Sequence, residues 1–243
     1  MTKTLTPILT ALAAAGMVVA VYLVFLKNPG AHAGIDYVID PENGRLVATS
    51  LFFSQRIVFW HVAHAFVLFT AVGVAGIASI FFLWKRNPRM DDIASAAVDV
   101  SVAMGAAVLV TGSIWAKAAW GVWWQWEPRL TMSLLLWLVL VGYALVRQFA
   151  GPSADRVAAG MAIFGMVGVP FIYTMVGQDS HPKSGANGTV FTLSPAIRPA
   201  FWIGVLAFML WFVVLVIVRV QAVRAAREVR ELRERALDLG VLE

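Results

Sequence analysis

The sequence predicts an all-α, polytopic membrane protein: a bundle of six transmembrane helices with both termini inside the cell. Its 243 residues are 60% hydrophobic and 14% charged, whereas soluble domains have about 45–50% apolar and about 25% charged residues. A membrane span needs about 20 apolar residues. Six stretches meet that length, approximately at 7–26, 57–84, 93–116, 130–146, 156–176 and 199–220.

The orientation follows from lysine and arginine, which are unevenly shared between the two sides of these spans. The side that holds both termini has twelve of the nineteen basic residues, six of them from Arg219 to Arg235, and the other side has seven. Because cytoplasmic flanks are enriched in lysine and arginine, we expect the termini to lie inside. Segments 28–56, 117–129 and 177–198 then lie outside. The net charge of +5 belongs mostly to membrane flanks and does not indicate nucleic-acid binding.

Both ends of the chain are expected to be helical parts of one integral membrane domain, 1–243. Ala31-His32-Ala33 resembles a signal-peptide cleavage site. The apolar core before it is longer than the roughly 7–15 residues of such signals, so we expect a retained anchor. Residues 221–243 carry apolar side chains at helical spacing, which predicts a cytoplasmic amphipathic helix that continues the sixth span.

The outer segment 117–129 contains the most unusual feature of the chain. Four of the ten tryptophans fall within seven positions: Trp120, Trp123, Trp124 and Trp126. One or two such residues are typical of a membrane-interface belt, but four beside Glu127 and Arg129 favour a platform for a flat, apolar ligand. Gly121 and Pro128 indicate that the segment is not one continuous helix. Pro128 suits the first turn of the fourth span, with Glu127 at its N-cap, so helix capping is an alternative role for Glu127.

Histidines and arginines accompany this segment on the outer side. His61 and His64 are one helical turn apart near the start of the second span, hence on one face, and His181 lies in the polar, turn-rich third outer segment. Ionisable residues in membrane spans indicate function by default, although an interfacial pair bonded to backbone or water is the alternative. Arg56 and Arg129 either anchor helix ends at the head groups or bind a ligand carboxylate.

One ligand class uses all of these residues. A porphyrin is flat and apolar, carries two propionates and takes two axial imidazoles at its iron. The tryptophans would hold the ring, Arg56 and Arg129 the propionates, and His61 and His181 the iron. The inner halves of the spans have no histidine, which disfavours an electron-transfer b-type cytochrome. The chain also has no cysteine, which excludes disulfides and thiolate metal sites.

The tryptophan-rich segment resembles the WWD motif of the cytochrome c maturation protein C (CcmC) family; it reads Trp120-Gly121-Val122-Trp123-Trp124-Gln125-Trp126-Glu127-Pro128-Arg129-Leu130-Thr131. Six spans and a histidine-bearing outer region on each side of the motif are also similar, so the resemblance covers essentially the whole chain. It implies non-covalent heme b at the periplasmic face of the bacterial inner membrane. His61 and His181 would be the axial ligands, with His64 as the alternate. The family usually has Asp at the position of Glu127, and His-Val-Pro where this chain has His61-Val62-Ala63.

The resemblance also implies a task. Heme would be presented to a membrane-tethered, CcmE-like heme chaperone, in concert with the CcmA-, CcmB- and CcmD-like subunits of an ABC-type complex. No catalytic residue is expected, since nothing resembles a nucleophile–base pair. Two alternatives stay open. One is a heme-attachment synthetase of the wider WWD superfamily, although those relatives tend to have more spans. The other is a non-heme permease or scaffold, supported only by Asp99, an acid inside the third span.

Overall fold

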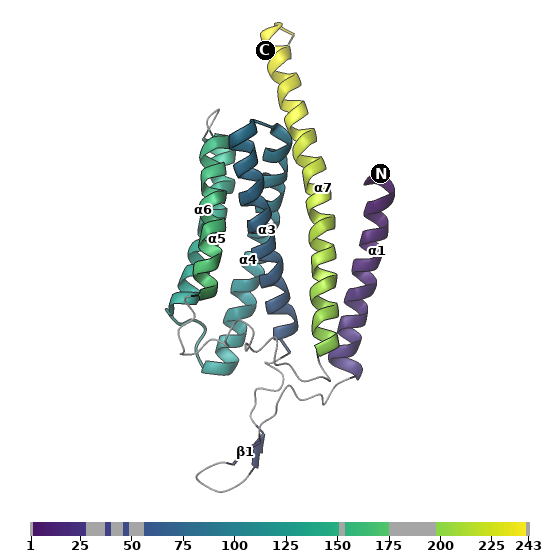
Figure 1. Cartoon of the computed structure of the whole chain (residues 1–243), viewed down its shortest axis with the longest axis vertical. Helices are drawn as coiled ribbons and strands as arrows, with labels where there is room; N and C mark the ends of the chain where they lie inside the picture. The colour runs from purple at the N-terminus through teal and green to yellow at the C-terminus, as the bar shows by residue number, and fades with distance from the viewer. Residues whose placement is uncertain are drawn as a thin grey trace.

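Six long helices dominate the computed structural model, which describes residues 2–27, 37–39, 46–48, 56–150, 154–174 and 198–241 (Figure 1). Their bounds are α1 Thr2–Val21, α3 Val58–Lys85, α4 Pro88–Trp120, α5 Pro128–Phe149, α6 Ala154–Thr174 and α7 Arg198–Asp238. A π-helical segment, η1 Tyr22–Lys27, continues α1. All six helices of the described chain are long and apolar enough to cross a membrane, which confirms the all-helical, six-span prediction.

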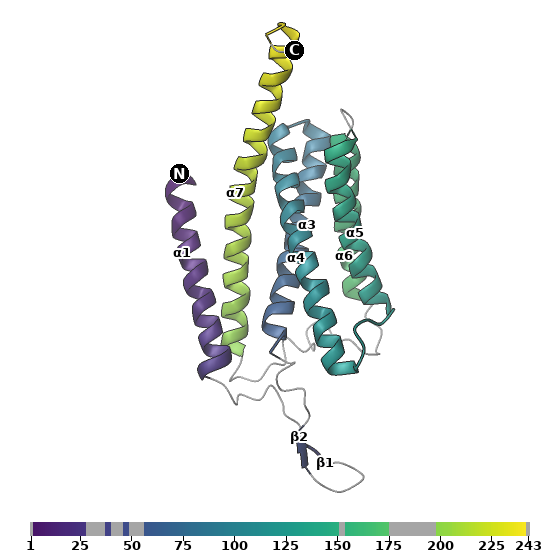
Figure 2. The same ribbon diagram turned by 180° about the vertical axis from the view of Figure 1, so that it is seen from behind.

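A short antiparallel strand pair was not predicted. It joins β1 Tyr37–Ile39 to β2 Leu46–Ala48, with Tyr37 opposite Ala48. The pair lies beyond the helix ends, on the side of the bundle away from the termini (Figures 1 and 2). It adds a small feature to the loop region and leaves the helical class of the fold unchanged.

The helices alternate in direction, so the N-terminus and the C-terminus lie toward the same end of the bundle (Figure 1). Helices α3, α4, α5 and α6 pack together, α7 packs against α3 and α4, and α1 contacts α7 at the edge of the molecule (Figure 2). The end of α7 extends past the other helices. The start of α3 and the α4–α5 connection lie at the opposite end, which we call the loop end.

A tight turn joins α3 to α4 at the end that holds the termini. Arg86 adopts the left-handed conformation with φ of 53° and ends α3. Asn87 then caps α4, because its Oδ1 accepts a 3.0 Å hydrogen bond from the Arg89 backbone N–H. Pro88 occupies the first helical position, where its missing N–H costs no hydrogen bond. The cap and the proline together explain why α4 starts at this point, several residues before the expected 93.

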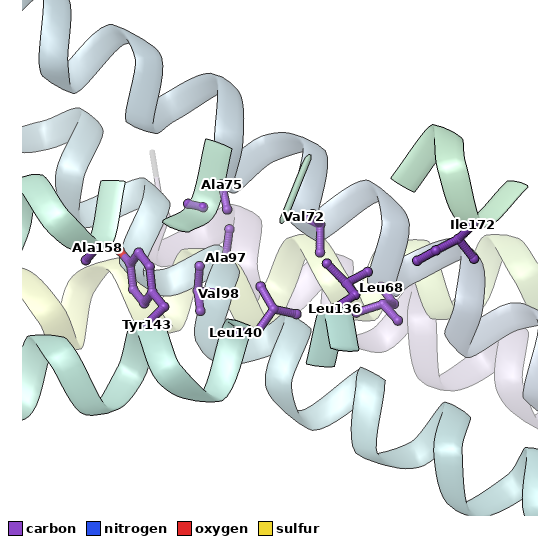
Figure 3. Close-up of a cluster of buried hydrophobic side chains, with 11 residues drawn as sticks. Leu68, Val72, Ala75, Ala97, Val98, Leu136, Leu140, Tyr143, Ala158 and Ile172 are labelled. Carbon is purple, nitrogen blue, oxygen red and sulfur yellow. The ribbon is translucent and has the colours of Figure 1, made fainter. Parts of the chain in front are cut away.

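The main core lies between α3, α4, α5 and α6 (Figure 3). Its buried side chains are mostly small or branched: Leu68, Val72, Ala75, Ala97, Val98, Leu136, Leu140, Tyr143, Ala158, Ala162 and Ile172. Small residues let membrane helices approach closely. Gly105 shows how closely, since a Cβ there would lie 2.5 Å from Cδ1 of Trp137. The Trp137 indole N–H also donates to the Val102 carbonyl at 2.9 Å, which fixes the ring over α4.

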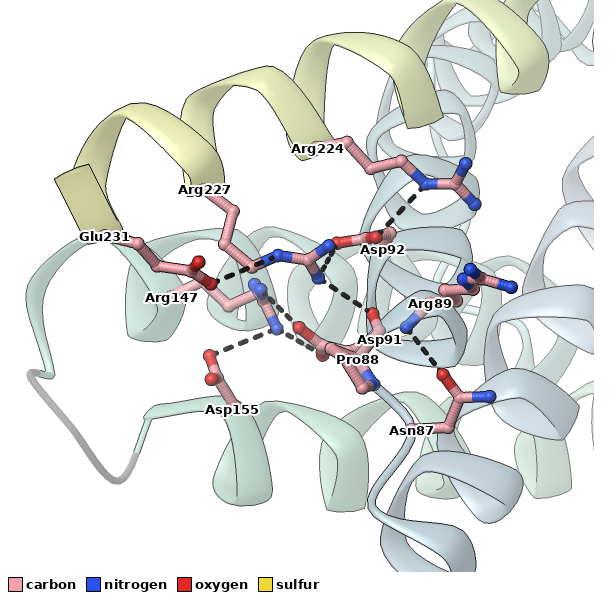
Figure 4. Close-up of polar contacts among 10 residues, drawn as sticks. All are labelled: Asn87, Pro88, Arg89, Asp91, Asp92, Arg147, Asp155, Arg224, Arg227 and Glu231. Carbon is pink, nitrogen blue, oxygen red and sulfur yellow. Dashed lines mark hydrogen bonds and ion pairs between the residues drawn. The ribbon is translucent and has the colours of Figure 1, made fainter.

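Ion pairs tie the helices together at the end opposite the loop end (Figure 4). Asp92 of α4, whose side chain is 1% exposed, accepts hydrogen bonds from Arg227 at 2.6 Å and Arg224 at 3.3 Å, both from α7. Arg147 of α5 donates two hydrogen bonds to Asp91, at 2.6 and 2.9 Å. The first turns of α4 therefore anchor both α5 and α7.

Asp99 has a similar explanation. Its carboxylate accepts a 2.6 Å hydrogen bond from Nε of Arg219 on α7. An acid bonded to a neighbouring helix needs no transport role, so the one observation that supported a permease has a structural account. The arginines in these pairs belong to the basic set at the end that holds the termini. The orientation rule counts lysine and arginine, and it does not depend on their acidic neighbours.

Candidate functional site

The tryptophan-rich segment begins where α4 ends. Gly121 adopts φ of 76°, and its N–H donates to the Lys117 carbonyl at 3.2 Å, which is a common glycine-terminated helix end. Lys117 Nζ donates in turn to the Gly121 carbonyl at 2.8 Å. Residues 121–127 are not helical, and α5 starts at Pro128. The break predicted from Gly121 and Pro128 is confirmed.

Three of the four motif tryptophans take part in two edge-to-face contacts, so the rings do not form one flat surface. Trp124 and Trp126 meet edge to face, with ring centroids 5.9 Å apart and planes at 75°. Trp120 meets Trp115 of α4 in the same way at 4.9 Å. Trp123 and Trp126 are 60% and 77% exposed, whereas the other two motif tryptophans are partly buried. The segment thus combines anchored rings with exposed rings that a ligand or partner can reach.

Trp124 carries a polar atom that points to a ligand. Its indole N–H is buried and has no hydrogen-bond partner among the described residues. Buried N–H groups nearly always find an acceptor in the protein, in ordered water or in a ligand. A carboxylate of the kind carried by heme propionates would supply that acceptor. The local chemistry therefore fits a porphyrin.

Glu127 occupies the N-cap position of α5, but its side chain makes no capping hydrogen bond. The N-cap contribution comes from its backbone carbonyl, which accepts from the Thr131 N–H at 3.0 Å. Helix capping therefore does not account for the carboxylate. Arg129 interacts electrostatically with Glu127 and with Tyr173 in the last turn of α6. Arg129, in the first turn of α5, is thus close enough to the end of α6 to interact electrostatically with it.

His61 lies at the start of α3 and faces α4. Its Nδ1 is 3.0 Å from the hydroxyl oxygen of Thr111. The ring also lies against Gly112, where an added Cβ would be 3.0 Å from His61 Cε1. The imidazole is partly buried at this helix–helix contact. Thr111 and Gly112 of α4 therefore position His61, the histidine predicted to be an iron ligand.

Helix α4 connects His61 to the tryptophan-rich segment. Thr111 and Trp115 are four residues apart and share a helix face, and Trp115 contacts Trp120. Thr111 precedes Trp120 by nine positions, about 13 Å along the helix axis. Neither Thr111 nor Trp115 is among the predicted site residues. Once Thr111 is seen to contact His61, the i,i+4 spacing from Thr111 to Trp115 identifies Trp115 as the next residue on the same face of α4.

His64 faces a different helix. Its Nδ1–H donates to the Trp60 carbonyl at 2.6 Å, and its ring centroid is 4.5 Å from that of Phe208 on α7. Residues three apart differ by about 60° around a helix axis, which is enough for His61 to contact α4 while His64 contacts α7. The two histidines were expected on one face, and the structure gives them separate neighbours.

The remaining predicted residues lie apart from this contact or outside the described chain. Arg56 lies two residues before the start of α3. Its guanidinium carbon is 5.3 Å from the centroid of the Phe25 ring in η1, a cation–π contact with the first span. His181 lies outside the described residues. Its segment connects the end of α6 to the start of α7, and both of these lie at the loop end (Figure 1).

Comparisons with known proteins identify the family. The family model described as Heme exporter protein C (CcmC) matches residues 46–236. The protein named Heme exporter protein C from Escherichia coli K12 is 31% identical over 172 residues, which cover 68% of this chain and 69% of that protein. Its namesake from Paracoccus denitrificans is 28% identical over 188 residues, or 74% and 76% of the two chains.

A third protein of that name, from Bradyrhizobium diazoefficiens, is 39% identical over 119 residues, which cover 48% of this chain but only 45% of the relative. The range matched by the family model runs from β2 into the last turns of α7. It includes His61, the α4 residues Thr111 and Gly112 that contact it, and the whole tryptophan-rich segment. The chain therefore belongs to the CcmC, or heme exporter protein C, family.

Proposed function

We propose that this protein binds heme at the periplasmic face of the bacterial inner membrane and delivers it to a membrane-tethered heme chaperone during c-type cytochrome maturation. The cargo would be non-covalent heme b. His61 and His181 would ligate its iron, while the tryptophan-rich segment and Arg129 would hold the macrocycle. The relatives' shared name, Heme exporter protein C, supports heme as the cargo.

The observation that carries this proposal is the contact between His61 and α4. The 3.0 Å approach of His61 Nδ1 to the Thr111 hydroxyl fixes the imidazole against the helix that ends in the tryptophan-rich segment. A heme site of the proposed kind combines an axial imidazole with apolar side chains around the macrocycle and polar groups for the propionates. The Trp124 N–H has no partner among the described residues, and the Arg129 guanidinium lies beside the same segment; both groups suit carboxylates.

The site is proposed to face the periplasm, with both termini in the cytoplasm. Twelve of the nineteen basic residues flank the spans at the end that holds the termini, and such an excess is typical of the cytoplasmic side. The partners proposed from family membership are a CcmE-like chaperone and an ABC-type complex with CcmA-, CcmB- and CcmD-like subunits. No bond-making step is assigned to this chain.

The test is the absorption spectrum of the purified protein with heme, compared among His61→Ala, His181→Ala and His64→Ala. We expect the first two variants to lose the low-spin spectrum and most of the bound heme, and His64→Ala to keep both. Unchanged heme content and an unchanged spectrum in the His61 and His181 variants would contradict the proposed ligands. Heme joined covalently to a cytochrome by this chain alone would indicate a heme-attachment synthetase instead.

A further inference from the structure

We infer that Thr111 and Gly112 are positioning residues for His61: the Thr111 hydroxyl fixes the tautomer of the imidazole and Gly112 makes room for its ring, so that Nε2 carries the lone pair offered to the heme iron. The inference rests on the proposed function. It concerns two α4 residues that touch the histidine and lie nine and eight positions before Trp120.

The direction of the hydrogen bond follows from the single proton of the threonine hydroxyl. Thr111 Oγ1 is 2.6 Å from the Ala107 carbonyl and 3.3 Å from the Val108 carbonyl, and a carbonyl can only accept. The hydroxyl proton is therefore used within α4. The lone pairs of Oγ1 remain for His61, so Nδ1 must be the donor across the 3.0 Å contact.

A neutral imidazole has one N–H and one lone pair. With the proton of His61 held on Nδ1 by Thr111, the lone pair lies on the second ring nitrogen, Nε2. Histidines that bind metals generally donate their second ring N–H to an oxygen acceptor, which sets both the tautomer and the ring orientation. Thr111 supplies such an acceptor from a different helix, so the imidazole is fixed relative to α4 as well as α3.

Gly112 controls the distance at which this hydrogen bond forms. An added Cβ would lie 3.0 Å from Cε1 of His61, 3.7 Å from Nδ1 and 3.9 Å from Nε2. The side of the ring that carries both nitrogens therefore lies directly over the glycine. A methyl group at this position would push the imidazole away from α4 by a few tenths of an ångström and lengthen the bond to Thr111.

The test uses conservative variants with matched controls. Thr111→Val keeps the shape of the side chain and removes the hydroxyl. Thr111→Ser keeps the hydroxyl and should therefore keep the wild-type His61 tautomer and heme binding. Ser113→Ala is the control, because Ser113 also donates within α4, to the Leu109 carbonyl at 2.9 Å. For Gly112→Ala, the control is Gly73→Ala in α3, where an added Cβ meets nothing within 4 Å.

The first measurement is the ¹⁵N NMR spectrum of the heme-free, full-length protein in detergent, with its histidine signals assigned by His61→Ala. We expect wild type, Thr111→Ser and Ser113→Ala to hold the His61 proton on Nδ1, and Thr111→Val to show mixed tautomers. An unchanged His64 signal reports that each variant is folded. A wild-type His61 protonated on Nε2, or a tautomer that does not respond to Thr111→Val, would overturn the inference.

The second measurement is a heme titration followed by absorption. Loss of an outer-shell partner typically weakens metal binding about 10- to 100-fold, and we expect Thr111→Val and Gly112→Ala to lose low-spin heme by a factor in that range. Thr111→Ser and both controls should titrate like wild type. If His61→Ala abolishes low-spin heme but Thr111→Val has no effect, the positioning role is wrong and the proposed function stands. Absence of heme binding by wild type would contradict the proposed function itself.

Discussion

At the scale of single residues, glycines determine which large side chains can reach a neighbouring helix. His61 lies over Gly112, Trp137 lies over Gly105, and Met166 lies within 3 Å of the Cβ position of Gly76. In each pair the glycine has no Cβ, which leaves room for the side chain of the neighbouring helix. The first of these contacts positions the candidate iron ligand, and the second helps to hold α5 against α4.

The contact at Gly105 gives a residue-scale prediction. In Gly105→Ala, the new Cβ would lie 2.5 Å from Trp137 Cδ1, so the indole must move and its 2.9 Å bond to the Val102 carbonyl must weaken. Overpacking of this kind destabilises a protein by about 1–3 kcal/mol. Thermal unfolding in detergent should show a lower midpoint than wild type.

Gly160→Ala serves as the control for that measurement, because an added Cβ at Gly160 meets nothing within 4 Å. Alanine is favoured over glycine in a helix by up to about 1 kcal/mol, so this variant should unfold at or slightly above the wild-type midpoint. Equal midpoints for the Gly105 and Gly160 variants would show that Trp137 adjusts without cost.

At the scale of helices, α4 organises the molecule. Its first turns bind α5 through Arg147 and α7 through Arg224 and Arg227, and its last turns hold His61 and the start of the tryptophan-rich segment. One rigid element therefore runs from the ion pairs near the termini to the candidate heme site at the loop end. Both the acids of α4 and apolar side chains contact α7 and help to hold it in place.

Asp92 tests the contribution of the acids. Its carboxylate is 1% exposed and pairs with two arginines of α7, and removal of one side of a buried ion pair typically costs about 3–5 kcal/mol. The arginines are 42% and 28% exposed, so water can replace part of the interaction. We expect Asp92→Ala to destabilise the protein by about 2–3 kcal/mol and to increase protease cleavage in the extension of α7.

Asp238→Ala, at the exposed end of α7, is the comparison variant for Asp92→Ala. It should leave the unfolding midpoint and the cleavage pattern as in wild type. If Asp92→Ala behaves like Asp238→Ala in both measurements, the ion pairs of Figure 4 do not hold α7 against α4.

The six spans were predictable because a helix must keep about 20 apolar residues in a bilayer, and composition alone reveals such runs. The helix partners of individual side chains were not. His61 and His64 differ by about 60° around α3, and only the packing of α3 decides that one meets Thr111 and the other Phe208. The pairing of Asp92 with Arg227 also joins residues 135 positions apart, which spacing rules along one helix cannot connect.

Thr111 was missed for a related reason. A threonine in an apolar span normally bonds the carbonyl one turn earlier, and Thr111 does so with Ala107. Its second role, as acceptor for His61, exists only when α3 lies alongside. Glu127 is a different case, since its position allowed a side-chain cap as an alternative role, and the structure does not form that cap.

At the scale of the whole molecule, the two ends of the bundle differ in chemistry. The end that holds the termini has ion pairs and the extension of α7, whereas the loop end has the tryptophan-rich segment and the start of α3 (Figure 1). Heme would therefore bind on the face away from both termini. A heme site in the periplasm therefore requires that both termini lie in the cytoplasm.

Single cysteines can report that orientation, because the chain has none of its own. Val122 in the tryptophan-rich segment and Leu239 after α7 are 41% and 78% exposed. We expect Val122→Cys to react with an impermeant maleimide in cells whose outer membrane alone is permeable, and Leu239→Cys to react only after the inner membrane is opened. The reverse pattern would place the candidate heme site in the cytoplasm.

The most direct test of the central claim, that His61 is a heme ligand, is chemical rescue of His61→Gly. In this variant the imidazole of His61 is missing while the rest of the site remains, so added imidazole can take its place at the iron. We predict that His61→Gly loses the low-spin absorption spectrum of the heme-loaded protein and that imidazole restores it. A low-spin spectrum in His61→Gly that matches wild type before imidazole is added would contradict the account.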